Sequence, residues 1–236
     1  PDELKIYPCS LIESAELMRN YREGSWRPYS RDELLEVLVA CVLATPAYCR
    51  LTRIIRDIPG TDIVDGNRTT NFREVVEREI ARRGGRPREI RSREVGEAEV
   101  EPAELRLERL GYSTSTGREV FFQYVDDAGR LAGFLRLALP AAPATADELR
   151  GRAVIREVHV YGRLVGIGGR EPGRSQHAGL GRALVERAAA EAARAGFGVI
   201  SVISAVGTRG YYRSLGFHDG ELYQHRAVRH AASAGG

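Results

Sequence analysis

Two closely spaced glycines, Gly179 and Gly181, precede a long run of Ala, Leu, Glu and Arg that predicts a helix from about Leu180. A β-branched strand and a glycine-rich loop come before them. The first backbone N–H groups of a helix are unpaired and lie at the positive end of its dipole, so they attract anions. Glycine removes the side chains that would keep a pyrophosphate away from the backbone. The segment QHAGLGRA (residues 176–183) therefore predicts a pyrophosphate site.

Other phosphate-binding loops fit this segment less well. It has two glycines where the dinucleotide-binding fingerprint G-x-G-x-x-G has three, and it lacks the G-K-[ST] of nucleoside triphosphatases. The alternative interpretation is purely structural: a helix that begins with glycine in order to pack closely on a sheet.

The elements around this segment predict an α/β domain. Residues 119–125 and 130–139 flank a turn at 126–129 and predict a hairpin, and residues 153–161 predict a further strand. After the long helix come a strand at 198–204, a short helical segment at 207–215 and a last strand near 216–224. This order requires at least one crossover between parallel strands.

The first third of the chain shows helical patterns and no strand alternation. Ser30 is a candidate N-cap with Glu33 closing a capping box, and the apolar run ends at Pro46. A second helix begins at the candidate cap Asn71 and ends at Gly84. Its apolar face consists of Phe72, Val75, Val76 and Ile80.

Arginines crowd the stretch that follows this second helix. They are Arg82, Arg83, Arg86, Arg88, Arg91 and Arg93, and three more (Arg50, Arg53 and Arg56) recur at three-residue spacing in a segment that we expect to be helical. Such clusters form either a solvated linker or a surface that contacts phosphates. The same stretch holds no Cys or His, so it predicts no metal site.

Composition narrows the class of protein. The chain has 236 residues, of which 43% are hydrophobic and 28% charged, which is ordinary for a soluble protein of one or two domains. No apolar run is long enough to span a membrane and no signal peptide is evident, so we expect a cytoplasmic protein. Cys9, Cys41 and Cys49 form no CxxC pair and are interpreted as reduced thiols. The first residue is Pro1, which suggests a piece of a longer chain.

The motif QHAGLG resembles the Q/R-x-x-G-x-G/A signature of the GNAT acetyltransferases, whose loop and helix hold the pyrophosphate of acetyl-CoA. Its neighbours REVHVYG (156–162) and VISAVGTRGYYRSLGF (202–217) resemble the catalytic acetyltransferase subunit of Elongator. Upstream, LKIYP, YCRLTRIIRDIPG, GNRTTNFRE and IRSREVG resemble the same family in the same order. That family joins a radical S-adenosylmethionine domain to an acetyltransferase domain and modifies C5 of the wobble uridine of tRNA, beginning from acetyl-CoA.

The resemblance implies a domain plan and a set of cofactors. Residues 1–90 would be the mainly helical C-terminal remnant of a radical S-adenosylmethionine domain, 91–118 a linker, 119–228 a GNAT domain with a mixed central sheet flanked by helices, and 229–236 a disordered tail. Acetyl-CoA would be the cofactor of this chain. S-adenosylmethionine and a 4Fe-4S cluster would belong to the full-length parent, since the cysteines that ligate the cluster are absent here. We therefore expect this chain alone not to complete the modification.

The resemblance also assigns the site. The strand residues Glu157, Val158, His159 and Val160 would meet the acetyl and pantetheine portion, and the pyrophosphate would lie on Gln176, His177, Ala178, Gly179, Leu180, Gly181, Arg182 and Ala183. Tyr212, with Tyr211 as its neighbour, would lie near the thioester sulfur, where a phenol can protonate the departing thiolate. Glu157 would be a general base, or else simply the partner of an arginine. His159 shares its face of the strand and fits a hydrogen-bonded structural role as well as a chemical one.

Three functions remain open at this level. The first is an Elongator-type tRNA uridine acetyltransferase, with tRNA contacted by the arginine clusters, the missing radical domain as its partner and no membrane involved. The second is an N-acetyltransferase of proteins or small amines. The third is a non-catalytic RNA-binding or assembly module that keeps acetyl-CoA as a structural ligand.

Overall fold

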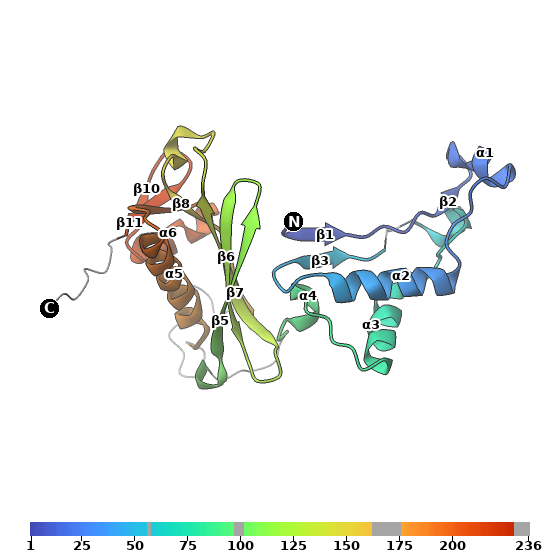
Figure 1. Cartoon of the computed structure of the whole chain (residues 1–236), viewed down its shortest axis with the longest axis horizontal. Helices are drawn as coiled ribbons and strands as arrows, with labels where there is room; N and C mark the ends of the chain where they lie inside the picture. Colours follow the sequence, from blue (N-terminus) through green and yellow to red (C-terminus); the bar gives the residue numbers. More distant parts are fainter. Residues whose placement is uncertain (56–57, 97–101, 162–175, 229–236) are drawn as a thin grey trace. The chain divides into compact units, whose positions relative to one another are not determined.

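The computed structural model describes residues 1–55, 58–96, 102–161 and 176–228, with the backbone alone described for residues 102 and 176–178 (Figure 1). The chain divides into two compact units, residues 1–93 and 94–236. The predicted strands, long helix and short helix near residue 210 all lie in the second unit. Among the described helices, none is long and apolar enough to cross a membrane.

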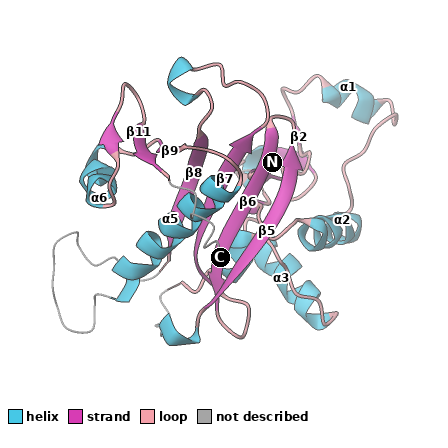
Figure 2. Ribbon diagram, turned by 60° about the vertical axis from the view of Figure 1, so that its left-hand side comes forward, coloured by secondary structure: helices cyan, strands magenta, loops and turns pink. Residues whose placement is uncertain are grey.

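The second unit is built on a mixed sheet of seven described strands in the order β10-β11-β9-β8-β7-β6-β5 (Figure 2). The strands are β5 (Arg106–Thr114), β6 (Gly117–Val125), β7 (Leu131–Pro140), β8 (Ala153–Val160), β9 (Val199–Val202), β10 (His218–Asp219) and β11 (Gln224–Ala227). Neighbours are antiparallel except β8 and β9, which are parallel. Parallel neighbours need a crossover, and helix α5 (Gln176–Arg194) lies between them in the chain. The mixed α/β class predicted from the element order is confirmed.

Helix α5 covers one face of this sheet (Figure 2). Leu184, Val185, Ala188 and Ala192 recur at helical spacing and are buried against residues of β6 to β9. Alternate strand residues such as Leu135, Leu137 and Ile155 face them. The sheet thus presents one apolar face to the helix.

The hairpin of β6 and β7 forms where the turn composition predicts it. Gly129 has a φ of 80°, which favours glycine, and its N–H donates to the carbonyl of Asp126 at 2.9 Å. Asp126 also accepts the backbone N–H of Arg130 at 2.8 Å.

Strand β5 was not predicted, and it lies in the stretch expected to be a linker. It pairs with β6 from Arg106 opposite Val125 to Thr114 opposite Gly117. Its sequence RLERLGYST is largely polar, and few of its side chains are deeply buried. An edge strand of this kind has little apolar alternation for a sequence pattern to reveal.

In its described residues, the first unit contains helices together with four short strands. Its elements are β1 (Glu3–Lys5), β2 (Leu11–Ile12), α1 (Leu17–Arg22), α2 (Arg31–Ala44), β3 (Arg50–Arg53), η1 (Gly60–Asp62), β4 (Ile63–Asp65), α3 (Phe72–Arg82) and α4 (Ile90–Arg93). β1 pairs with β3 in parallel and β2 with β4 antiparallel. The expectation that this part has no strands was wrong, because strands of two to four residues are too short to show an alternation. The remaining short helices, η2 (Pro102–Glu104), η3 (Asp147–Leu149), η4 (Val206–Thr208) and α6 (Arg209–Ser214), belong to the second unit.

Both predicted helices of the first unit form, but only one has the predicted cap. Ser30 accepts the N–H of Glu33, and the Glu33 carboxylate accepts the N–H of Ser30, so the capping box of α2 is confirmed. At the start of α3 the Asn71 side chain makes no cap; it donates to the Glu74 carboxylate at 3.3 Å instead. Phe72, Val76 and Ile80 are buried on one face of α3 as predicted.

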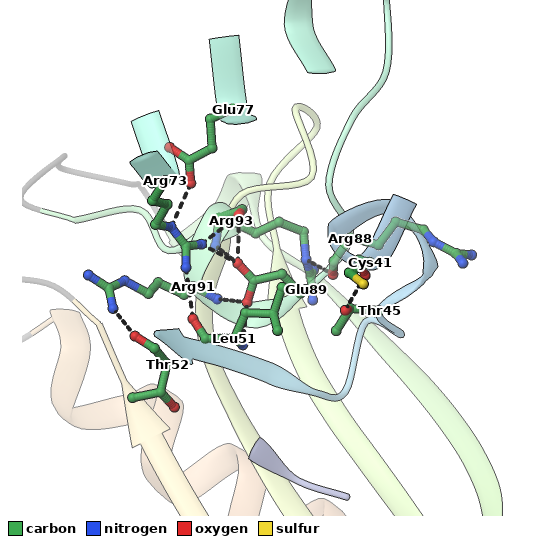
Figure 3. A network of polar contacts seen from close by, with 11 residues as sticks. Cys41, Thr45, Leu51, Thr52, Arg73, Glu77, Arg88, Glu89, Arg91 and Arg93 are labelled. Carbon is green, nitrogen blue, oxygen red and sulfur yellow. Dashed lines mark hydrogen bonds and ion pairs between the residues drawn. The ribbon is translucent and has the colours of Figure 1, made fainter. Parts of the chain in front are cut away.

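A buried carboxylate joins three elements of this unit (Figure 3). Glu89 is fully buried and accepts hydrogen bonds from the backbone N–H groups of Leu51, Arg91 and Ser92. Arg73 of α3 pairs with it at 2.7 Å and also donates to the carbonyl of Leu51 at 2.8 Å. Burial raises the pKa of Glu89, but these hydrogen bonds and the charge of Arg73 outweigh burial and lower the pKa overall. Glu89 therefore connects β3, α3 and α4 as a carboxylate.

We predict that Glu89→Gln destabilises the first unit by about 3 kcal/mol or more, because an amide NH2 would face donors that now have an acceptor. The folded pKa lies below the ordinary value of about 4.3. The wild-type carboxylate therefore contributes stability above that pH, and the contribution is lost as the pH falls through the folded pKa. Chemical unfolding across acidic pH should show a steeper loss in wild type than in the variant. Equal slopes would contradict this role.

Candidate functional site

The register of β7 and β8 contains one extra residue, Arg156. Arg136 lies opposite Glu157 and the next β7 residue, Leu137, lies opposite Ile155, so Arg156 forms a β-bulge. The bulge reverses which side chains face α5. Before it Ala153 and Ile155 face the helix, and after it Val158 packs against the same core. Glu157 and His159 are thereby placed on the other face.

The bulge also marks the end of the pairing between β8 and β9. In the described part of the chain, Ala153, Val154 and Ile155 pair with Ile200, Ser201 and Val202, while β8 continues to Val160. Residues 157–160 remain paired with β7 on their other side. The edge of β8 beyond the bulge therefore offers backbone N–H and C=O groups to an extended ligand.

Helix α5 begins four residues earlier than predicted, at Gln176. Gly179 and Gly181 thus lie within its first two turns and do not precede it. The unpaired N–H groups of the helix belong to the residues around Gln176, His177 and Ala178, whose backbone alone is described, and Gly179 follows them directly. Arg182 is exposed one turn further on and adds positive charge. The predicted anion site therefore stays a prediction, and its expected position moves to one turn before the predicted helix start.

The two glycines are glycines for different reasons. A Cβ at Gly181 would lie 2.8 Å from the hydroxyl of Tyr211 and 3.7 Å from Cγ2 of Val160, so the absence of a side chain lets α6 and β8 approach α5. A Cβ at Gly179 would meet nothing within 4 Å. A glycine with neither a crowded Cβ position nor a positive φ costs helix stability without a packing benefit. No described residue thus crowds the backbone of Gly179 beside the first amides of α5.

Tyr211 and Tyr212 are placed differently. The Tyr211 phenol lies against Gly181 of α5, and burial raises its pKa, with the charges of Arg182 and Glu186 acting in opposite directions. Tyr212 is 8% exposed and packs edge-on against Tyr211 and Phe217 in the core. Burial raises the pKa of Tyr212 to about 12. The structure therefore brings Tyr211, Gly181 and Val160 together, and Tyr212 packs against the ring of Tyr211 on the core side.

Glu157 holds two cationic or donor partners on the face opposite α5. Arg136 donates to its Oε2 at 2.7 Å, and Nε2 of His159 lies 3.1 Å from its Oε1. Burial raises the pKa of Glu157, but the hydrogen bonds from His159 and Arg136 outweigh burial and lower it overall. The prediction that Glu157 and His159 share a face is confirmed by this contact. His159 also stacks on Phe134, with ring centroids 5.3 Å apart.

The remaining predicted site residues line the same region. Val158 packs on the core under α5, Val160 and Leu180 belong to a smaller apolar cluster, and Ala183 is half-buried in the second turn of α5. Among the described residues, no three His, Cys, Asp or Glu side chains are grouped so that they could hold a metal ion.

The arginines predicted to contact RNA differ in position and in bonding partners. Arg50 and Arg53 lie on β3, not on a helix, the register of β3 shifts between Leu51 and Arg53, and Arg56 lies outside the described residues. Arg82 and Arg83 pair with Glu79, and Arg83 also pairs with Glu36. Arg91 donates to the carbonyl of Thr52, and Arg93 donates to the carbonyls of Arg88 and Ala47 (Figure 3). Arg86 and Arg88 are exposed.

Comparison with known proteins shows which family the chain resembles. Residues 1–82 match the family described as the Radical_SAM C-terminal domain. The chain is 35% identical over 226 residues to the tRNA uridine(34) acetyltransferase of Dehalococcoides mccartyi, covering 92% of this chain and 49% of that protein. It is 37% identical over 224 residues to human Elongator complex protein 3, covering 92% of this chain and 41% of that protein. Over 92% of its length, the chain is similar to proteins of the Elongator protein 3 family.

A solved structure extends this result to the fold. Elp3 of Methanocaldococcus infernus, with its first 46 residues deleted, superposes with a TM-score of 0.85 at 35% identity, covering 97% of this chain and 56% of that one. The chain thus spans about half of the length of these Elongator protein 3 relatives, or slightly less in the case of the human protein.

The two glycines provide a test of the site geometry. Gly179→Ala should stabilise the second unit by about 0.5–1 kcal/mol, since the described residues leave room for its Cβ. Gly181→Ala should not raise stability in wild type, because its Cβ would lie 2.8 Å from the Tyr211 hydroxyl. In a Tyr211→Phe background that hydroxyl is missing, so the same change should raise stability. Thermal unfolding of the four Gly181 and Tyr211 combinations measures this coupling. Additive effects would contradict the contact.

Proposed function

We propose that the second unit is a GNAT acetyltransferase domain that binds acetyl-CoA, and that the chain is the C-terminal half of an Elongator-type tRNA uridine(34) acetyltransferase. The observation that carries the proposal is the end of β8–β9 pairing at the Arg156 bulge, on a strand whose last residue, Val160, lies beside Gly181 of α5. Relatives that are 35–37% identical and bear the names tRNA uridine(34) acetyltransferase and Elongator complex protein 3 support it.

The described groups fit the chemistry of this ligand. The unpaired amides at the start of α5, with the open backbone of Gly179 and the charge of Arg182, suit a pyrophosphate. The edge of β8 from Glu157 to Val160 suits the amide groups of pantetheine, which pair as a strand would. When bound, acetyl-CoA supplies an acetyl group activated as a thioester.

Tyr211 is the phenol that we assign to the departing thiolate, in preference to Tyr212. Tyr211 touches the start of α5, whereas Tyr212 is packed in the core. Because burial raises its pKa, Tyr211 stays protonated at neutral pH and is available as a donor. Tyr212 then holds the ring of Tyr211 in position through their edge-on contact.

Glu157 serves as a positioning residue in this account. A carboxylate with a lowered pKa and partners on both oxygens is a weak base. Its bonds to Arg136 and His159 instead fix the segment of β8 after the bulge, whose backbone would meet the ligand.

The proposal is tested by measuring CoA release from acetyl-CoA by this chain, with tRNA, without it, and with a lysine peptide instead. We expect release to be stimulated by tRNA and to fall about a hundredfold in Tyr211→Phe. Tyr212→Phe is the matched control and should bind CoA with less effect on release. Release that follows the peptide and ignores tRNA would support an N-acetyltransferase, and tight binding with no release would support a non-catalytic module.

We further propose that Arg86 and Arg88 contact tRNA phosphates. Both side chains are exposed, and neither takes part in the ion pairs that Arg82 and Arg83 form with Glu79 and Glu36. The double variant R86E/R88E should weaken tRNA binding and reduce its salt dependence by about one counterion per lost contact. The control R19E/R187E changes two other exposed arginines by the same charge. Equal effects of both variants would show that only net charge matters.

A further inference from the structure

A pocket of about 450 Å³ opens beside the point where β8 and β9 separate. Ile155 and Arg156 of β8 and Ile203, the residue after β9, line it. Its outer wall is the segment after β7, and Tyr223 closes the side toward β11. The size is in the usual range for a small-molecule site.

This pocket includes the face of the sheet opposite α5. Val154 and Ala138 line it and pair directly across β7 and β8, and the neighbours of Val154, Ala153 and Ile155, face α5. A ligand that extends along β8 from the start of α5 would therefore meet the pocket at Arg156, the bulge residue.

Hydrogen bonds of Glu148, which we call the clasp, join two walls of the pocket. Glu148, from the segment after β7, accepts the backbone N–H groups of Leu222 and Tyr223 and lies 2.8 Å from Nε2 of His225. Burial raises the pKa of Glu148, but these hydrogen bonds lower it to about 2, so it is a carboxylate at neutral pH. Gly220 leaves room for the clasp, since a Cβ there would lie 2.2 Å from Glu148 and 2.4 Å from His225. The pocket is therefore preformed.

The lining chemistry selects the class of acceptor. Among the described residues that line the pocket none is acidic, and the one charged side chain, that of Arg156, is paired with the carboxylate of Glu119 at 2.5 Å. Tyr223 and the rings of Pro140 and Pro143 offer flat apolar surfaces, and Thr116 and Thr145 offer hydroxyls. A neutral planar ring with polar edges fits these walls, whose described lining residues offer no carboxylate to bind a lysine ammonium group.

We infer that this pocket receives the pyrimidine base of the RNA substrate, with Tyr223 stacking on the ring. The inference rests on the proposed function and adds the place where the base is held while the acetyl group lies at the bulge. Base–aromatic stacking is tolerant of sequence and strong enough to hold a base that has left its helix.

The test uses an anticodon stem-loop RNA with 4-thiouridine at the wobble position, irradiated with this chain in the presence of CoA and mapped by mass spectrometry. We expect the cross-link on Tyr223 or on residues 138–149. Ala144→Trp, which fills the pocket, should lower the cross-link yield about tenfold or more, as should Tyr223→Ala. Ala146→Trp is the matched control, because Ala146 lies in the same segment and does not line the pocket.

Binding of CoA and of the RNA is measured separately for each variant. If wild type binds both but cross-links only outside the pocket, or if Ala144→Trp and Ala146→Trp cross-link equally well, the pocket inference is overturned and the proposed function stands. Failure of wild type to bind CoA, or to bind the RNA, overturns the proposed function as well.

Discussion

The extra residue at Arg156 is the constraint on which the rest of the second unit depends. Without it, strict alternation would place Glu157 and His159 under α5, where their charge would be buried among alanines and leucines. With it, valines take those places, and the carboxylate pairs with Arg136 on the other face. The same insertion marks the end of β8–β9 pairing and, in the described part of the chain, leaves residues 157–160 without a partner strand on that side. One residue thus separates the apolar core, this strand edge and the polar face.

The two glycines in the first turns of α5 differ in the space around their Cβ positions. Gly181 is explained by packing, because the Tyr211 phenol occupies the space of a side chain. Gly179 meets no such neighbour among the described residues, so packing there does not explain its cost to helix stability. We propose that a phosphate at the helix start is the partner of its backbone. The Tyr211 contact also joins α6 to α5, which brings three distant segments to one place.

Local signals predicted the elements better than the site. The capping box of Ser30, the turn at Gly129 and the spacing of α5 are each determined by neighbours in sequence, and all three form as expected. The bulge, the clasp of Glu148 and the different burial of Tyr211 and Tyr212 depend on strand register and tertiary packing. No pattern in the sequence distinguishes the two adjacent tyrosines. The polar sequence of β5, by contrast, fits an edge strand as well as the linker that was predicted there.

Hydrogen exchange of the backbone amides with and without acetyl-CoA tests the central claim most directly. The account predicts that the ligand slows exchange in two separated segments together, residues 157–160 of β8 and the first two turns of α5, and that Gly179→Ala reduces both effects. Protection confined to one of these segments, or found elsewhere in the second unit, would contradict a ligand that runs along the free edge of β8 to the start of α5.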